Sequence, residues 1–576
     1  MTFEYIDNLI DGIELDLEFL QRKTQRNKVI LYQHEGNLSA NNQKIGNSTK
    51  VTRNFISAMR IAHNEGADLF MTPEYSCPWE SIKEMLNNDR LLPPAGKLWV
   101  LGCESISLAD LAVLKNESNN ELIEIHFDQN LENTNSFVDP VCYVFKGSVG
   151  GNVKTFIIVQ FKTFHMGVWQ GGDIERDNII LGQKIYVIKN NLSTINLITV
   201  ICSEAMDFRA YLTQANKDFL EWVDKPYYLL HTQFNPDPYH RDFIDFRACV
   251  FSEEHKEIIA LNWQLRSKVV GSDLLPHCNA RSGFYINSNQ LNLTPGRINA
   301  NHKKGLYYFN NKKNRHSYFL SSQPHLFAIE NSPLKISEGV IPQQRRDGPE
   351  VTKVYELNGV EFIEIDEVDD AQIEYYGRID CTNEFLRDNL KCVIDKERLV
   401  SISSGFVDKN KEWWRIENVD SIQMDSGTEI NRRITVARNE SNESLNHRNS
   451  YCEAIAELER IITEKNSLPS NIEDISDEEL KIGFTEDSEE EWYRFNVLKN
   501  NGENIFVTLC YIGSATEDEA YRVYVSVRKL FSKPETKDYE RVVVYYKRGT
   551  NIQPMCDTSF ANITETHDYD DDSIAK

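Results

Sequence analysis

Three short apolar runs constrain this chain most, because each is followed by a side chain that can take part in chemistry. They are residues 68–71 before Glu74, residues 156–161 before Lys162, and residues 195–201 before Cys202. Continuous apolar runs that alternate with helical segments are typical of strands buried on both faces, with helices outside. In layered α/β proteins, functional side chains gather at strand ends and in the loops that follow. We therefore predict an α/β fold in which these three residues meet.

A carboxylate, an ammonium and a thiol are sufficient for covalent hydrolysis of a carbon–nitrogen bond. Cys202 attacks only as a thiolate, so it needs a base or a positive charge nearby. Glu74 follows an apolar run, and burial would raise its affinity for the thiol proton. Lys162 can stabilise the oxyanion of a tetrahedral intermediate, and the backbone N–H of Ser203 can be a second donor. The protonated Glu74 would then return its proton to the leaving amine.

At these residues the sequence resembles the nitrilase superfamily of carbon–nitrogen hydrolases, whose members use a Glu–Lys–Cys triad. The resemblance implies a four-layer α-β-β-α sandwich, which often dimerises through its helices, with Glu74, Lys162 and Cys202 as the triad. It covers roughly residues 25–330, a little over half of the chain. The matching segments, in the order of the family, are 28–33, 66–74, 98–102, Glu175 with Gly182, 245–248 and 257–262.

The segment after the nucleophile departs from the family. Many members continue with an aromatic residue, an aspartate and then Arg-Phe-Pro. This chain keeps an acidic residue two positions on, Glu204, but lacks Arg-Phe-Pro between Ala205 and Phe208. Because these positions would border the pocket, the resemblance does not identify the substrate. Nitriles, ω-amides, carbamoylated amines and glutamine all remain open.

Two further residues have alternative interpretations. Glu175 lies where the family places a second glutamate, but it could equally be a carboxylate at the start of a helix. Tyr75 directly follows Glu74 and could line the pocket, but it could also be a core tyrosine. A rival mechanism would pair Cys202 with a histidine. Its candidates are His165, His231, His240 and His255. Replacement of Lys162 separates the two mechanisms, because only the Glu–Lys–Cys mechanism requires it.

Composition excludes several classes of protein. The chain has 576 residues, enough for two to four domains, and its 40 % hydrophobic content can build cores. No apolar stretch is long enough to cross a membrane, and we see no secretory signal at the N-terminus. The 11 cysteines include no Cys-x-x-Cys pair, so we expect a cytoplasmic protein without a metal site or cofactor. A net charge of −25 makes nucleic-acid binding unlikely.

The chain divides into three parts by its sequence pattern. Residues 1–26 are predicted to form a helical extension, and residues 27–340 the nitrilase-like domain. A linker is expected at 343–349, because it is polar and ends in Gly-Pro. Residues 350–576 are predicted to form an α+β region of unknown role, perhaps two modules, with acidic clusters at 473–491 and 568–572. Solvated surface explains these clusters, and a docking surface for a basic protein partner is the alternative.

Two classes of function follow. The first is a hydrolase that acts on a small-molecule amide, nitrile or carbamoyl compound through a Cys202 thioester, and that forms a homo-oligomer. The second is a non-catalytic interaction protein on the same scaffold. Nitrilase-like modules also occur beside reverse transcriptases in bacterial phage defence, a setting that a large C-terminal region makes conceivable. An intact triad favours the hydrolase.

Overall fold

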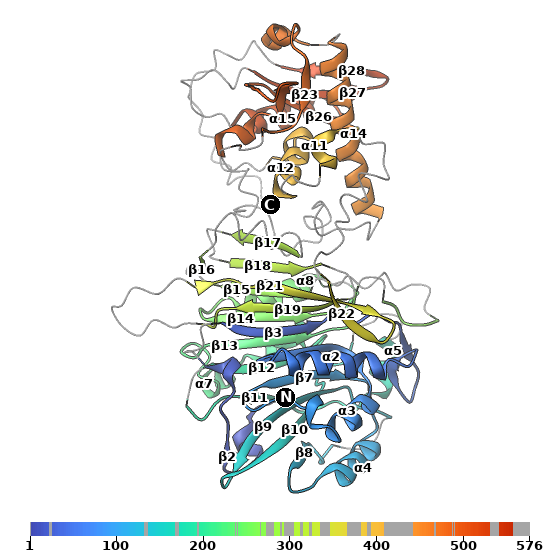
Figure 1. The fold of residues 1–576 in the computed structure, drawn as a ribbon, viewed down its shortest axis with the longest axis vertical. Helices are drawn as coiled ribbons and strands as arrows, with labels where there is room; N and C mark the ends of the chain where they lie inside the picture. Colours follow the sequence, from blue (N-terminus) through green and yellow to red (C-terminus); the bar gives the residue numbers. More distant parts are fainter. Residues whose placement is uncertain are drawn as a thin grey trace, which may run out of the picture. The chain divides into compact units, whose positions relative to one another are not determined.

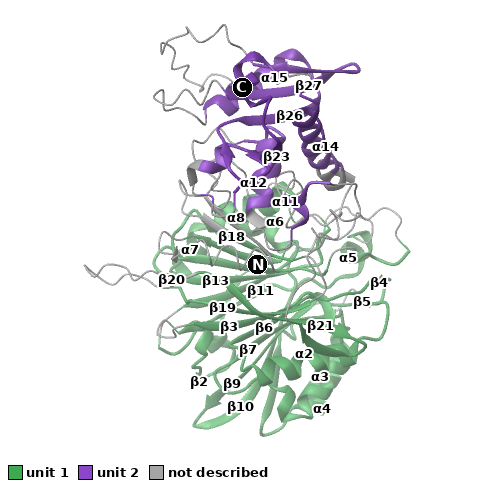
Figure 2. Cartoon of the chain, turned by 45° about the horizontal axis from the view of Figure 1, so that its top comes forward, with its two compact units in different colours: residues 1–369, 423–431, 435–440 green, residues 370–422, 432–434, 441–576 purple. Residues whose placement is uncertain are grey.

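The computed structural model (Figure 1) shows a mixed α/β protein with several sheets. The residues that it describes are 2–21, 26–131, 136–166, 172–192, 195–236, 238, 240–264, 267–271, 282–287, 291–292, 305–310, 315–321, 325–334, 346–365, 382–388, 393–407, 442–465, 468–485, 488, 490–529 and 541–556. They fall into two compact units (Figure 2). The first contains the described residues from 2 to 365, and the second those from 382 to 556.

Two large sheets form the first unit. In spatial order, the eight-stranded sheet contains β1 (Thr2–Tyr5), β11 (Lys184–Ile188), β12 (Asn196–Ile201), β13 (Tyr227–Thr232), β14 (Lys256–Leu261), β15 (Gly283–Asn287), β18 (Arg315–Leu320) and β17 (Gly305–Asn310). The ten-stranded sheet contains β22 (Glu361–Ile365), β21 (Glu350–Asn358), β19 (His325–Asn331), β3 (Asn27–Tyr32), β6 (Leu69–Cys77), β7 (Leu98–Cys103), β9 (Pro140–Val149), β10 (Asn152–Phe161) and β8 (Ile123–Phe127). A tenth, short strand, β2 (Ile13–Glu14), pairs with β9.

The central strands are apolar on both faces because each face packs against a different layer. In β3, Val29 and Leu31 belong to a core shared by both sheets, which includes Leu230 of β13. Ile30 and Tyr32 point the other way, into a second core. The helices of that second core are α2 (Thr52–Asn64), α3 (Trp79–Leu86) and α4 (Leu108–Ser118). This arrangement explains the continuous apolar runs of the sequence.

Helices also pack on the eight-stranded sheet, at the strands beside Cys202. They are α6 (Glu204–Tyr211) and α8 (Arg241–Val250). Phe208 of α6 contacts Phe246 of α8, with ring centroids 5.1 Å apart. Phe246 in turn lies 5.3 Å from the ring of His231 on β13. Shorter elements of the unit are α1 (Ile6–Leu9), β4 (Leu38–Ala40), β5 (Ile45–Asn47), α5 (Gly172–Asn178), α7 (Gln214–Phe219), β16 (Leu291–Asn292) and β20 (Arg346–Asp347).

The N-terminal segment differs from the helical extension expected over residues 1–26. It contains the edge strand β1, the short helix α1 and the strand β2, and β1 pairs in parallel with β11. The reason lies in the pattern from Ile13 to Leu17, where Ile13, Leu15 and Leu17 alternate with acidic residues. Alternation of this kind is the signature of extended chain. All three side chains are buried in the core that the two sheets share.

The boundary of the first unit also differs from the sequence prediction. Residues 343–345 of the expected linker lie outside the described residues. Arg346–Asp347 form the strand β20, and the strands β21 and β22 extend the ten-stranded sheet instead of opening a C-terminal region. Their polar side chains pair with α2 and the loop after it. Lys353 lies 2.8 Å from Glu65, and the hydroxyl of Ser57 donates to Glu361 at 2.8 Å.

The second unit has an apolar core of its own. It contains α11 (Glu384–Arg387), α12 (Val393–Ser403), α14 (Asn442–Glu464), β23 (Leu480–Ile482), β24 (Val497–Lys499), β25 (Asn504–Ile505), β26 (Thr508–Ser514), α15 (Glu517–Arg528), β27 (Val542–Arg548) and β28 (Asn551–Met555). One core includes Leu458 of α14, Val497 of β24 and Val544 of β27. The parallel strands β26 and β27 are connected through α15, which begins with a capping box at Thr516.

Some expectations fall outside what the structure describes. The acidic tail at 568–572 and residues 486, 487 and 489 of the acidic stretch are not among the described residues. Among those that are, no helix is both long enough and apolar enough to cross a membrane.

Candidate active site

Strands of both large sheets deliver the three residues predicted to act together. Glu74 lies in β6, where the pairing with β7 shifts register between Thr72 and Cys77. Lys162 directly follows β10, and Cys202 directly follows β12. Lys162 is in hydrogen-bond contact with Glu74, and the thiol of Cys202 interacts with the same carboxylate. The structure therefore brings the predicted residues into one cluster.

Lys162 lies among three carboxylates. Its Nζ is 2.6 Å from Oε1 of Glu74, 2.8 Å from Oε1 of Glu175 and 3.5 Å from Oδ2 of Asp139, and all four side chains are fully buried. Burial by itself lowers the pKa of a lysine. Here the attraction of Glu175, Glu74 and Asp139 outweighs burial and raises the pKa of Lys162 well above its ordinary value. Lys162 is therefore charged at neutral pH.

Glu74 is held in place by groups of the eight-stranded sheet and its loops. Its Oε2 accepts a hydrogen bond of 2.6 Å from the backbone N–H of Phe234, and its backbone oxygen accepts one of 2.7 Å from the indole of Trp263. With Lys162 on Oε1, the two carboxylate oxygens thus each have a donor. These donors hold the carboxylate in one orientation.

Cys202 occupies a sharp turn between β12 and α6. Its φ of 39° lies in the left-handed region, a conformation that costs free energy for a residue other than glycine. Its N–H donates to the carbonyl of Thr232 at 2.8 Å, and its Sγ lies 3.7 Å from the carbonyl of Phe234. The side chain is only 4 % exposed. Burial, the charge of Glu74 and the hydrogen bond to it raise the pKa of the thiol well above its ordinary value.

Tyr75 has the same unusual backbone conformation, with φ at 57°. Its ring lies 5.7 Å from the ammonium of Lys162 and belongs to an apolar cluster at the site. The other buried members of that cluster are Leu38, Ile45, Phe137, Ile179, Phe234 and Trp263. The charged cluster is therefore surrounded by apolar and aromatic side chains, which strengthens the electrostatic interactions within it.

Glu175 and Ser203 also lie at the site. Glu175 belongs to the first turn of α5, and besides Lys162 it binds the backbone N–H of Met166 at 2.9 Å. It thus combines the two alternatives that the sequence left open. The hydroxyl of Ser203 donates to the carbonyl of Phe164 at 2.9 Å, away from the thiol. Among the described residues, the backbone N–H of Ser203 has no acceptor, so it is free to bind an oxyanion.

Glu204 fixes Lys162 and Cys202 relative to each other. Its Oε1 accepts hydrogen bonds from the N–H and the hydroxyl of Thr163, at 2.6 and 2.7 Å. Its Oε2 accepts one of 2.7 Å from the N–H of Ile201. The bridge therefore connects the neighbour of the lysine to the neighbour of the nucleophile. Burial raises the pKa of Glu204 to about 7, although these hydrogen bonds oppose the shift.

Sequence reasoning missed Asp139. It precedes Pro140 at the start of β9, and its backbone carbonyl accepts the N–H of Lys162 at 2.9 Å. An aspartate before a proline is a common turn signal, so the sequence alone gives no reason to assign it to a site. Its position follows from the antiparallel pairing of β9 with β10, in which Pro140 faces Phe161.

The histidine candidates do not contact the thiol. Among the described residues, no histidine is in hydrogen-bond contact with Sγ of Cys202. His231 contacts Cys202 through the backbone and not through the thiol, because its Nε2 lies 3.1 Å from the backbone oxygen of Cys202. Burial lowers its pKa to about 3, so it is neutral. In the described part of the chain, no group of His, Cys, Asp and Glu side chains is arranged for a metal ion. The ammonium of Lys162 lies between the carboxylates instead.

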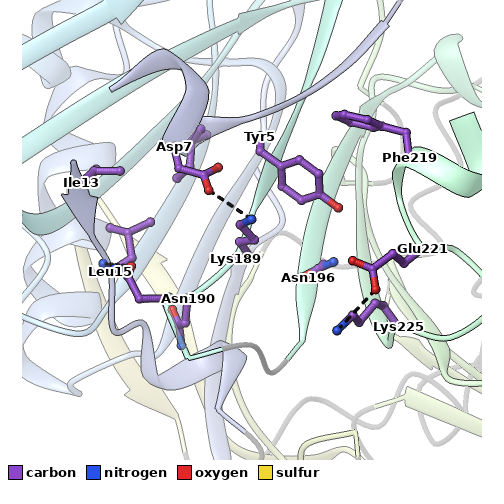
Figure 3. A pocket seen from close by; sticks show the side chains of 12 residues that line it. Tyr5, Asp7, Ile13, Leu15, Lys189, Asn190, Asn196, Phe219, Glu221 and Lys225 are labelled. Carbon is purple, nitrogen blue, oxygen red and sulfur yellow. Dashed lines mark hydrogen bonds and ion pairs between the residues drawn. The ribbon is translucent and has the colours of Figure 1, made fainter. Parts of the chain in front are cut away.

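A separate pocket lies near the N-terminus (Figure 3). Its volume is about 400 Å³, and we call it the N-terminal pocket. It is lined by Tyr5, Ile6, Asp7, Ile13, Leu15, Lys189, Asn190, Asn191, Asn196, Phe219, Glu221 and Lys225. None of these residues belongs to the cluster around Lys162. Figure 3 shows Lys189 beside Asp7 and Lys225 beside Glu221, so the lysines of this pocket are paired with acids.

Comparisons with known proteins give remote similarities. No family model and no curated protein matches the sequence. One similar solved structure is a glutamine-dependent NAD+ synthetase from Acinetobacter baumannii in complex with ADP, with a TM-score of 0.31 and 13 % identity over 55 % of this chain and 49 % of the synthetase. Another is XC1258 from Xanthomonas campestris, a CN-hydrolase superfamily protein with an arsenic adduct in its active site. Its TM-score is 0.26, with 10 % identity over 45 % of this chain and 83 % of XC1258. The first match spans about half the length of the synthetase, and the function proposed below rests on the geometry of the site.

Proposed function

We propose that this protein hydrolyses a non-peptide carbon–nitrogen bond through a thioester on Cys202, in the manner of the nitrilase superfamily. The observation that carries the proposal is the contact of Glu74 with Lys162 in a fully buried cluster, together with the electrostatic influence of both groups on the thiol of Cys202. A buried lysine and carboxylate are costly to retain as structural elements alone. Beside a thiol at a strained turn, they are the groups that covalent catalysis needs.

The residues of the site have different tasks in the proposed reaction. Glu74 takes the proton of Cys202, and Sγ attacks the carbon of the substrate. Lys162 and the free N–H of Ser203 stabilise the negative charge that develops on the substrate oxygen, or on the nitrogen of a nitrile. With an amide or carbamoyl substrate, Glu74 gives its proton to the leaving amine, which departs and leaves the thioester. With a nitrile, the proton goes to the nitrogen, a water adds to the resulting thioimidate, and ammonia departs to leave the thioester. Glu74 then activates a water that hydrolyses the thioester and regenerates the thiol.

The thiol is neutral in the resting state, so the proton transfer has to be coupled to substrate binding. Burial and the charge of Glu74 raise the pKa of Cys202 well above its ordinary value. A substrate carbon near Sγ converts the emerging thiolate into a bond, and Lys162 compensates the charge that moves to the substrate. Buried, uncharged nucleophiles are therefore compatible with catalysis when base and oxyanion donors are already in position.

The apolar shell around the cluster supports a small substrate. Tyr75, Phe137, Phe234 and Trp263 are fully or almost fully buried there. A small-molecule amide, nitrile or carbamoyl compound with an apolar part would suit this environment. The proposal includes the four-layer α-β-β-α sandwich, assembly into a homo-oligomer, and a role for the second unit in binding a protein partner.

Intact-mass spectrometry tests the proposal. The full chain would be incubated with a panel of amides, nitriles and carbamoyl compounds, with Cys202→Ala as the control. We expect a mass increase with at least one compound that is absent in Cys202→Ala, and the added mass would identify the acyl group. Ser203→Ala is the matched variant, because it keeps the backbone N–H and removes only the hydroxyl that binds Phe164.

A non-catalytic scaffold is the second candidate. The observation that favours it is the thiol itself, which is 4 % exposed and has a raised pKa. Inert buried cysteines have these properties. Two results together would favour this candidate over the hydrolase. No compound of the panel would give an adduct, and Cys202 would resist alkylation by iodoacetamide in the folded protein. Capture of partners with the full chain would then be the next experiment.

A further inference from the structure

Asp139 differs from the other two carboxylates of the site in its hydrogen bonds. Within the described residues, neither of its side-chain oxygens has a hydrogen-bond partner that meets ordinary geometry, although the side chain is fully buried. The ammonium of Lys162 lies 3.5 Å from Oδ2. That distance is longer than an N–H···O hydrogen bond. Lys162 instead makes short contacts with Glu74 and Glu175, at 2.6 and 2.8 Å.

The charges around Asp139 do not balance if all the groups are ionised. Among the described residues, Lys162 is the only cation that pairs with Glu74, Glu175 and Asp139. Three ionised carboxylates would leave two uncompensated negative charges on side chains that expose no surface to solvent in the resting protein. Ionised carboxylates buried without donors are strongly disfavoured, and they take up a proton instead. Asp139 has Lys162 at 3.5 Å and the neutral hydroxyl of Tyr75 as donors. Glu74 and Glu175 have Lys162 at 2.6 and 2.8 Å and a backbone N–H each. Asp139 is therefore the carboxylate that gains most from a proton.

We propose that Asp139 carries a proton in the resting protein and donates it in a hydrogen bond to Glu74, which makes it a positioning residue for the base. Both carboxyl groups lie against the same ammonium, with Nζ of Lys162 2.6 Å from Glu74 and 3.5 Å from Asp139, and Glu74 acts on the pKa of Asp139 through charge and hydrogen bonding. The O–H of a protonated Asp139 would then have Glu74 as its acceptor. Glu74 would accept from three donors, namely Asp139, Lys162 and the backbone N–H of Phe234. Sharing of one proton between adjacent carboxyl groups is an established solution for closely placed acids.

The other groups that face Asp139 agree with a neutral acid. The carboxyl groups of Glu74 on β6 and Glu175 on α5 disfavour a negative charge on Asp139. Lys162, which follows β10, favours a negative charge on Asp139. Burial and the two glutamates outweigh this attraction and raise the pKa of Asp139 well above its ordinary value. Tyr75, which also interacts with Asp139, is neutral, because burial and the surrounding carboxylates raise its pKa well above the ordinary value.

The consequence for the reaction concerns the base. A neutral donor on Glu74 holds the carboxylate in one orientation, in which it can accept the thiol proton and then pass it to the leaving amine. This consequence rests on the proposed hydrolysis. The protonation of Asp139 is a property of the folded protein and needs no substrate, so it can be tested separately.

Infrared spectroscopy of the full chain tests the protonation directly. A protonated carboxylic acid has a carbonyl absorption distinct from that of a carboxylate. At about pH 9, Glu204 is ionised, because its pKa is about 7. We expect an acid band to persist at this pH in the wild type and in Glu204→Gln, and to be missing in Asp139→Asn. No band in the wild type, or a band that remains in Asp139→Asn, would overturn the proposal. If Asp139→Asn does not fold, carbon-13 labelling of aspartate replaces it, since the wild-type band must then shift.

The rate at which iodoacetamide alkylates Cys202 gives a second readout. An ionised Asp139 would suppress the thiolate, so its replacement by asparagine at about pH 7 would speed alkylation at least about tenfold. A protonated Asp139 predicts a change below about threefold, because the asparagine N–H substitutes for the O–H. An acid band without any substrate adduct would refute the hydrolase and keep the inference. Substrate adducts on Cys202 without the acid band would support the hydrolase and refute the protonation of Asp139.

Discussion

Two groups of charges in the first unit pair lysines with acids under opposite conditions. In the candidate active site, Lys162 lies 2.6 Å from Glu74, and both side chains are fully buried. In the N-terminal pocket, Lys189 lies 3.1 Å from Asp7, with exposed fractions of 37 % and 43 %. Both pairs join a lysine to a carboxylate, and the two sites differ in their exposure to water.

Water decides what each pair can do. An exposed ion pair is screened by solvent and contributes about 0–1 kcal/mol to stability. A buried pair adds little net stability either, but the loss of one partner leaves an uncompensated charge, which costs about 3–5 kcal/mol. The cluster around Lys162 is therefore sensitive to the loss of a charged partner, and the N-terminal pocket is tolerant. The four predictions below test that contrast, from the largest expected effect to the smallest.

Replacement of Lys162 by methionine should have the largest effect. It removes the cation from among Glu74, Glu175 and Asp139, so we expect the free energy of unfolding to fall by about 3–5 kcal/mol. Urea denaturation followed by circular dichroism measures this loss. We also expect slower alkylation of Cys202, because Lys162 favours the thiolate. A loss below about 1 kcal/mol would show that the carboxylates are already neutral and that the cluster is not an ionic one.

Much of this contrast could be predicted from the sequence. The apolar runs before Glu74, Lys162 and Cys202 predict strands buried on both faces, and the strands β6, β10 and β12 occupy those positions. Local pattern suffices here because a strand covered on both faces has to be apolar at every position. The exposed lysines of the N-terminal pocket carry no such signal, since charged residues are ordinary at a surface.

The features of the site that the sequence does not reveal depend on contacts between segments far apart in the chain. Asp139 gains its place through the pairing of β9 with β10, and Glu204 through hydrogen bonds to Thr163, which lies 41 positions away. Neither partner can be inferred from neighbouring residues. The N-terminal strands are a different case. The alternation of Ile13, Leu15 and Leu17 is visible in the sequence, and its period of two residues favours extended chain over the predicted helix.

Replacement of Glu204 by glutamine should have the next largest effect. Glutamine has one oxygen, so it cannot accept from both Thr163 and Ile201, and one buried N–H loses its acceptor. We expect a loss of about 1–3 kcal/mol in the free energy of unfolding. Because Lys162 and Cys202 shift relative to each other, turnover should fall about tenfold to a hundredfold.

A matched control separates position from stability in that variant. Thr163→Val removes the hydroxyl bond to Glu204 at 2.7 Å and leaves both backbone bonds. We expect it to keep most of the turnover. The same measurements apply to both variants, namely urea denaturation and the kcat for the substrate that the mass-spectrometric panel identifies. Equal turnover in Glu204→Gln and Thr163→Val would contradict a positioning role for the carboxylate.

Acid should destabilise the buried region through His231. Burial lowers its pKa from the ordinary value of about 6.5 to about 3. The unfolded chain therefore binds a proton that the folded protein cannot bind, and stability falls as the pH falls from about 6.5 towards 3. For this group, the loss between pH 7 and pH 5 is on the order of 2 kcal/mol. Urea denaturation at both pH values measures it, and His231→Asn should lose less between them than the wild type. Parallel pH dependence in the two proteins would refute the assignment.

Replacement of Lys189 by methionine should have the smallest effect. The ammonium of Lys189 lies 4.3 Å from the ring centroid of Tyr5 and pairs with Asp7, and methionine keeps the apolar stem while it removes the charge. We expect a loss of less than about 1 kcal/mol, reduced further by added salt, because solvent screens the pair. Alkylation of Cys202 should proceed at the wild-type rate, since the N-terminal pocket shares no residue with the cluster around Lys162. A loss above about 2 kcal/mol, or a changed alkylation rate, would mean that the N-terminal segment transmits the state of this pocket to the candidate active site through the core that both sheets share. Exposure alone would then no longer distinguish the two groups of charges.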